Sequence, residues 1–73
     1  MHKQATSLRK TLAAQVKSRR DALGWSQEKL AEEAGTSQVY VSQLENAKRG
    51  ISIDVLEKLA HALGVKAGDL LGK

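Results

Sequence analysis

The stretch from Gln27 to Leu44, QEKLAEEAGTSQVYVSQL, constrains the fold of this chain more than any other part of the sequence. Small and apolar residues occupy its fourth, fifth, eighth, ninth, fifteenth and eighteenth positions, which are Leu30, Ala31, Ala34, Gly35, Val41 and Leu44. Ala31 is small enough for two helices to cross closely, and Gly35 can take the left-handed conformation of a sharp turn. Val41, three residues before Leu44, would help to anchor a second helix on the first. The pattern predicts two short helices joined by a very tight turn.

A longer helix is predicted before this pair. It begins near Thr6 or Ser7 as the N-cap and runs to Leu23, where Gly24 stops it. Its inward face is expected to consist of Leu8, Leu12, Val16 and Leu23. Residues 1–6 are expected to be frayed.

Serine residues mark the starts of the other helices, and the predicted N-caps are Ser26, Ser37 and Ser52. A fourth helix ends at Gly64, and its apolar set is Ile53, Val55, Leu56, Leu59, Ala60 and Leu63. A short fifth helix is expected at about Ala67 to Leu71. Because Pro and Phe are absent while Leu and Ala recur at helical spacing, we predict an all-α fold. Residues 1–73 should form one domain, a compact five-helix bundle.

The amino-acid composition limits the classes of function that are expected for this protein. Twelve Lys and Arg against eight Asp and Glu give a net charge of +4, which favours an anionic partner, although a soluble surface of mixed sign accounts for this charge equally well. No Cys is present, so neither a disulfide framework nor a thiolate metal site is expected. No apolar run approaches the roughly 18 residues of a membrane span, and the N-terminus lacks the apolar segment of a signal peptide. We therefore expect a cytoplasmic protein.

Catalysis has no support in the sequence. No nucleophile with a base and an orienting acid, no paired carboxylates in a cleft and no phosphate-binding loop can be assembled. His2 and His61 have no Cys or second His at the spacing of metal ligands. We expect a protein that is not an enzyme and that uses no metal and no cofactor.

The segments LGWSQEKLAEEAGTSQVYVSQLENAKRG and IDVLEKLAHALGV resemble the phage repressor and Cro-like helix-turn-helix proteins, often called the Xre family. The resemblance covers roughly Val16–Leu71 and implies a lambda repressor-like DNA-binding domain. The chain departs from the family pattern after the third helix, where the family usually has Glu-Asn-Gly and this chain has Glu45, Asn46 and Ala47. We therefore predict that, if one residue at this point has a left-handed conformation, it is Asn46. Lys66 stands where family members often have Ser or Thr before the last helix.

The resemblance places the helix at about Gln38–Glu45 in the major groove of DNA. Because Val41 and Leu44 point inward, the exposed face of this helix carries the candidate base contacts, which are Gln38, Val39, Ser42 and Gln43. A glutamine can donate and accept together at an adenine edge, and Val39 offers an apolar contact to a thymine methyl group.

The candidate phosphate contacts flank this helix and are Gln27, Tyr40, Asn46, Lys48 and Arg49. The resemblance implies that Gln27 bonds a phosphate and braces Gln38, at a helix N-terminus that itself favours anions. Lys48 and Arg49 form a second phosphate clamp in the loop. The ring of Tyr40 covers the junction of the two short helices, or its hydroxyl reaches a phosphate, and both alternatives stay open.

The resemblance also implies a structural ion pair between Arg20 and Glu45. Both residues fall on otherwise inward faces, and the planar geometry of the two groups suits a bidentate contact. Lys17 and Arg19 either approach the DNA backbone or face water.

We predict a small transcriptional regulator, a repressor rather than an activator, that associates with the nucleoid by binding double-stranded DNA. The alternative is an antitoxin-type or other protein-interaction module on the same fold. One recognition helix touches only a few base pairs, so we expect a homodimer on a near-palindromic operator. The expected contact surface, mainly by family resemblance, is Leu63, Val65, Leu70 and Leu71, unless these residues close the core of the monomer.

Overall fold

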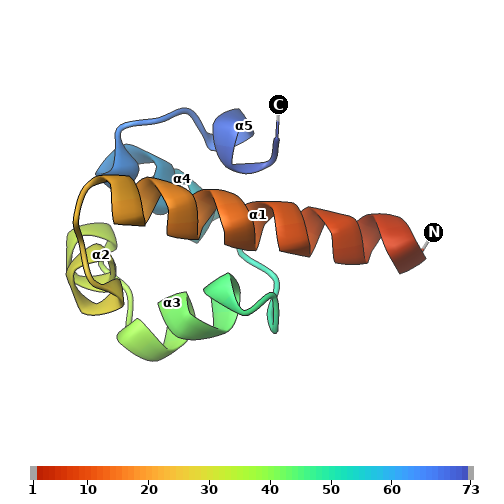
Figure 1. Cartoon of the computed structure of the whole chain (residues 1–73), viewed down its shortest axis with the longest axis horizontal. Helices are drawn as coiled ribbons and strands as arrows, with labels where there is room; N and C mark the ends of the chain where they lie inside the picture. Colours follow the sequence, from red (N-terminus) through yellow and green to blue (C-terminus); the bar gives the residue numbers. More distant parts are fainter. Residues whose placement is uncertain (1, 73) are drawn as a thin grey trace.

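The computed structural model describes residues 2–72, with side chains from Leu8 onward, and this part of the chain is all helical. Its helices are α1 (His2–Ala22), α2 (Gln27–Ala34), α3 (Gln38–Glu45), α4 (Ile53–Leu63) and α5 (Ala67–Leu70). Figure 1 shows α1 crossing the molecule, with α3 on one side of it and α5 on the other, and α1 contacts both helices. The predicted all-α fold with five helices is confirmed within the described residues.

The start of α1 differs from the prediction. The helix begins at His2, so Thr6 and Ser7 lie inside it and neither is its N-cap. Lys, Gln and Ala are good helix formers, and nothing between His2 and Thr6 interrupts a helix. Residues 2–6 are helical, while the fraying expected for residues 1–6 stays a prediction, and Met1 lies outside the described residues.

Buried aliphatic side chains from all five helices form one core. Its members are Leu12, Val16, Leu30, Ala31, Ala34, Val41, Leu44, Leu56, Leu59, Ala60, Leu63 and Leu70. The prediction of inward-facing residues is wrong at three positions. Leu8, Leu23 and Ile53 are 50%, 46% and 70% exposed. Helical spacing predicts on which side of a helix a residue lies. It does not predict whether another helix packs against that side at the position of the residue.

The predicted serine caps are confirmed. The side chains of Ser26, Ser37 and Ser52 accept hydrogen bonds of 3.0 to 3.2 Å from backbone N–H groups in the first turns of α2, α3 and α4. The tight turn between α2 and α3 passes through Gly35, whose φ of 69° is in the left-handed region. A glycine takes this conformation without steric cost, which allows α3 to begin only a few residues after α2 ends.

The prediction that Asn46 is left-handed is wrong. Its φ is −92°, and Ala47 has the positive φ of 57° instead. The backbone N–H of Ala47 donates to the Leu44 carbonyl at 3.0 Å, and that of Lys48 donates to the Gln43 carbonyl at 2.9 Å. This pair of bonds defines a Schellman motif, in which the residue after the C-cap is left-handed. Asn46 is the C-cap, so the left-handed position falls on Ala47.

Substituting Ala47→Gly should stabilise the protein by on the order of 0.5–1 kcal/mol, because the Cβ of alanine is strained in the left-handed region and glycine has no Cβ. Urea denaturation measures this change. The matched control is Ala14→Gly at an exposed position within α1, which should destabilise the protein by about 1 kcal/mol. Equal destabilisation by the two substitutions would show that Ala47 is not left-handed.

The C-terminal segment completes the core of the monomer. Leu63 and Leu70 are 7% and 0% exposed, and the half-buried Val65 and Leu71 pack against the same core. For Leu63 and Leu70 the alternative prediction is confirmed, because both close the core of their own chain and neither lies on a contact surface between two copies. Along the described residues, no helix combines the length and the apolar character needed to traverse a lipid bilayer.

Candidate nucleic-acid interface

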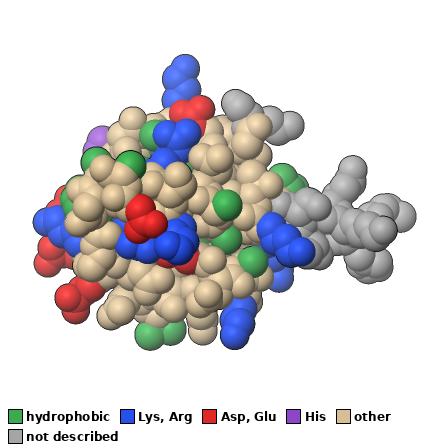
Figure 2. Space-filling view, viewed as in Figure 1, with side chains coloured by type: hydrophobic (Ala, Val, Ile, Leu, Met, Phe, Trp, Pro, Cys, Tyr) green, Lys and Arg blue, Asp and Glu red, His purple; other side chains and the backbone are tan. Residues whose placement is uncertain are grey.

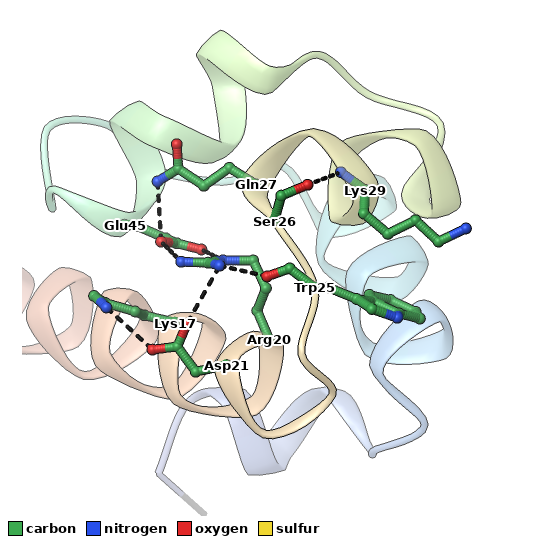
Figure 3. Close-up of polar contacts among 8 residues, drawn as sticks. All are labelled: Lys17, Arg20, Asp21, Trp25, Ser26, Gln27, Lys29 and Glu45. Atoms are coloured by element: carbon green, nitrogen blue, oxygen red, sulfur yellow. Dashed lines mark hydrogen bonds and ion pairs between the residues drawn. The ribbon is translucent and has the colours of Figure 1, made fainter.

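A buried ion pair fixes the end of α3 to α1. The Arg20 Nε donates to Glu45 Oε2 at 2.6 Å, and Nη2 donates to Oε1 at 2.9 Å, so the contact is bidentate (Figure 3). The Arg20 Nη1 donates to the carbonyl oxygen of Trp25 at 2.6 Å. The two charged side chains are only 10% and 3% exposed. The hydrogen bond from Arg20 to Glu45 is the main reason that the pKa of Arg20 is raised.

Gln27, at the start of α2, joins this ion pair. Its Nε2 donates to Glu45 Oε1 at 3.1 Å, as Figure 3 shows. The amide nitrogen of Gln27 thus faces the Glu45 carboxylate, and the contact between Gln27 and Gln38 stays a prediction. One carboxylate thus connects α1, α2 and α3 and sets the orientation of α3.

The exposed face of α3 carries the four residues predicted to contact bases. Gln38, Val39, Ser42 and Gln43 line one open depression on the surface. Val39 is 65% exposed, whereas the residues on the opposite face, Val41 and Leu44, are buried. The apolar side chain of Val39 has no role in the core and is available for contact with a partner. We call the surface formed by these four residues the reading face.

The loop after α3 folds back onto the helix. Arg49 Nη1 donates to Gln43 Oε1 at 3.0 Å. The Cζ atom of Arg49 lies 3.9 Å from the centre of the Tyr40 ring, a cation–π geometry. Arg49 and Tyr40, both predicted as phosphate contacts, thus bind each other at the end of the reading face.

Other basic residues lie around the same loop. Lys48 and Asn46 are exposed in it. A Cβ atom added at Gly50 would lie 3.6 Å from Nη2 of Arg9, so the guanidinium of Arg9 lies beside the loop. Figure 2 shows Lys and Arg side chains over this end of α3 and the adjoining part of α1. Arg9 was not among the predicted contacts, because its position depends on how α1 crosses α3.

Lys17 and Arg19 make contacts within α1. Lys17 pairs with Asp21 one turn later at 3.1 Å, and Arg19 donates to Gln15 one turn earlier at 3.2 Å.

Acidic side chains concentrate at another part of the molecule. Four acidic residues line a depression between α2 and α4 together with Lys58 and His61, and these are Glu32, Glu33, Asp54 and Glu57. None of the four residues of the reading face is acidic. Among residues 2–72, no group of three or more His, Cys, Asp or Glu side chains is arranged to hold a metal ion.

The sequence of this chain matches a known protein family. The family model HTH_3, described as helix-turn-helix, matches residues 16–70. A hypothetical transcription factor of Neisseria meningitidis serogroup B is 44% identical over 64 residues, which cover 88% of this chain and 60% of that protein. The control protein C.BamHI of Bacillus amyloliquefaciens is 48% identical over 46 residues, which cover 63% of this chain and 57% of that protein. The chain thus spans less than two thirds of the length of either relative.

A solved structure shares most of this arrangement of helices. The crystal structure of the restriction-modification controller protein C.AhdI from Aeromonas hydrophila has a TM-score of 0.82 and 32% identity to this chain. The match covers 85% of this chain and 94% of that one. Because the family model covers most of the sequence and the helices superimpose, this chain belongs to the helix-turn-helix family HTH_3, as its resemblance to Xre-like proteins implied.

Proposed function

We propose that the protein is a transcriptional regulator that binds double-stranded DNA at specific sequences, with α3 in the major groove. The observation that carries this proposal is the reading face, where Gln38, Val39, Ser42 and Gln43 share one exposed surface opposite the buried face of α3. An α-helix fits the major groove, and amide and apolar side chains there distinguish base edges. The relatives described as a hypothetical transcription factor and as a control protein support the same function.

The charge distribution supports the same orientation on DNA. Arg9 and Lys48 lie around the loop at the end of α3, and Gln27 lies at the N-terminus of α2. We assign these three residues, together with Asn46 and the hydroxyl of Tyr40, to phosphate contacts. The acidic depression between α2 and α4 would be repelled by phosphates, which favours approach through α3. We further propose that the protein represses transcription. A protein that occupies an operator excludes other proteins from it, and it needs no second binding surface to do so.

Substitutions should separate base reading from phosphate binding. Gln38→Ala and Gln43→Ala should each weaken binding to the preferred site by roughly 1–3 kcal/mol. Each should also reduce the preference for one base over the others, but only at a few base pairs. Lys48→Ala should weaken binding to all duplexes and lower the slope of log affinity against log salt by about one. Fluorescence anisotropy with an operator selected from a random duplex pool measures both effects.

The matched control for Lys48→Ala is Lys58→Ala, which removes a lysine beside the acidic depression and should leave DNA binding unchanged. Equal losses from the glutamine and Lys48 substitutions on every duplex would contradict the two roles. If wild-type affinity for DNA does not depend on salt, the protein-interaction alternative is favoured instead.

We also propose that two copies bind a near-palindromic operator, with half-sites about 34 Å apart, because one α3 reads too few base pairs to mark a site in a genome. Of the predicted contact residues, Val65 and Leu71 remain partly accessible. Sedimentation at increasing concentration, with and without a palindromic duplex, should show two protomers per duplex that bind cooperatively. Independent binding of single protomers to the two half-sites would exclude the dimer while leaving the role of α3 unaffected.

A further inference from the structure

Tyr40, Gln43 and Arg49 form a cluster at the end of the reading face. Arg49 Nη1 donates to Gln43 Oε1 at 3.0 Å, and the guanidinium lies over the Tyr40 ring. The Nε atom of Arg49 is buried and has no hydrogen-bond partner within the described residues. The half-buried guanidinium of Arg49 thus lies against the protein surface, between the Tyr40 ring and the Gln43 amide.

The contact with Arg49 determines which end of the Gln43 amide faces the loop. A glutamine amide carries an acceptor oxygen and a donor nitrogen, whereas a guanidinium carries only donors. The opposite orientation of the amide would bring donors against donors. Stacking on Tyr40 limits rotation of the guanidinium, so the oxygen of Gln43 is held toward Arg49.

We propose that Arg49 is a positioning residue that makes Gln43 a donor-only reader of base edges. A bidentate contact with adenine requires the amide oxygen and nitrogen to face the base together, but the bond to Arg49 turns the oxygen toward the loop. Gln43 then presents its Nε2 hydrogens to the groove and selects acceptors. Guanine offers two acceptors, N7 and O6, whereas adenine offers one acceptor and one donor.

This inference rests on the proposed DNA binding, and it replaces two expectations from the sequence. Gln43 should prefer guanine to adenine at its base pair, and Arg49 should act through Gln43 and not through a phosphate. The base preference of α3 thus depends on a residue that lies outside the helix.

The test compares wild type with Arg49→Lys, which keeps the positive charge and removes the planar donor group. The base pair read by Gln43 is first identified as the one whose preference disappears in Gln43→Ala. At that base pair, wild type should prefer guanine to adenine by roughly 5- to 150-fold. In Arg49→Lys this ratio should fall by about fivefold or more, because a flexible ammonium lacks the planar group that lies over the Tyr40 ring and holds the Gln43 amide less firmly, so that its oxygen can turn toward adenine. The salt dependence should stay the same.

Arg19→Lys is the matched control, since Arg19 lies on α1 and contacts Gln15. Its base profile should equal that of wild type. An unchanged profile in Arg49→Lys, or an equal loss of affinity for every sequence, would overturn the inference and leave the proposed function standing. A wild type that prefers adenine at this base pair would also overturn it. A wild type that selects no DNA sequence would overturn the proposed function and this inference together.

A measurement without DNA tests the cluster itself. In the free protein, NMR resonances of the Arg49 side chain should be displaced by the ring current of Tyr40, and Tyr40→Leu should abolish this displacement. Resonances of Arg49 that are the same in wild type and Tyr40→Leu would show that the guanidinium does not stack on the ring, and would overturn the positioning role.

Discussion

Replacing Arg20 by alanine should lower the free energy of unfolding by about 3–5 kcal/mol. The substitution leaves the carboxylate of Glu45 buried without its charged partner and removes the donor to the Trp25 carbonyl. A domain of 73 residues has a total stability of only about 4–11 kcal/mol, so this loss is a large part of the total. If the total lies at the low end of this range, a large fraction of Arg20→Ala molecules should be unfolded near room temperature. Thermal and urea denaturation followed by circular dichroism measure the change.

The neighbouring Arg19→Ala is the matched control. The side chain of Arg19 bonds Gln15 within the same helix, α1, so its removal should change stability by no more than about 0.5 kcal/mol. The double variant Arg20→Met, Glu45→Leu removes both charges and should be more stable than Arg20→Ala, because no buried charge is left unpaired. Coincident melting curves for Arg20→Ala and wild type would mean that the ion pair does not hold α3.

The raised pKa of Arg20 also determines how the contribution of Arg20 to the free energy of unfolding depends on pH. A group whose pKa is higher in the folded state stabilises the protein fully at pH values below its unfolded pKa. The stabilisation is lost only as the pH rises through the folded pKa, which for Arg20 lies above the ordinary value of arginine. The contribution from Arg20 should therefore be constant across the neutral range.

Leu44→Ala should destabilise the protein by about 2–5 kcal/mol, since the side chain is fully buried between α3 and the core. The residue lies on the same short helix as the reading face, so losing it should also weaken the packing that holds this face in place. Urea denaturation gives the change in stability, and binding to the selected operator should fall together with the folded fraction.

Val39→Ala is the control within the same helix. Val39 is 65% exposed, so this substitution should change stability by no more than about 0.5 kcal/mol. It should nevertheless weaken binding at sites where a thymine methyl group meets Val39. If Val39→Ala destabilises the protein as much as Leu44→Ala does, the assignment of buried and exposed faces of α3 is incorrect.

Local features of the fold could be predicted from the sequence because they depend on residues close together in the chain. Ser26, Ser37 and Ser52 cap their helices through bonds that span three residues, and Gly35 supplies the turn. The separation of Leu44 from the exposed Val39 follows from the helical period alone. These features do not depend on the positions of the other helices.

Contacts between distant parts of the chain were harder to predict. The pairing of Arg20 with Glu45 was expected only from family resemblance. The third member of that contact, Gln27, was assigned a different partner, because a long side chain bonds whichever group the packing brings within reach. Arg49 was likewise expected at a phosphate, and the folded loop places it against Gln43.

The sequence by itself determined where the helices α2, α3 and α4 begin and which face of α3 is apolar, because capping and helical periodicity act over one or two turns. Only the tertiary structure decided that Leu8, Leu23 and Ile53 stay exposed while Leu70 is buried, since burial depends on whether another helix covers that position. It also decided that Arg9 lies beside the loop after α3, because that placement depends on how α1 crosses α3.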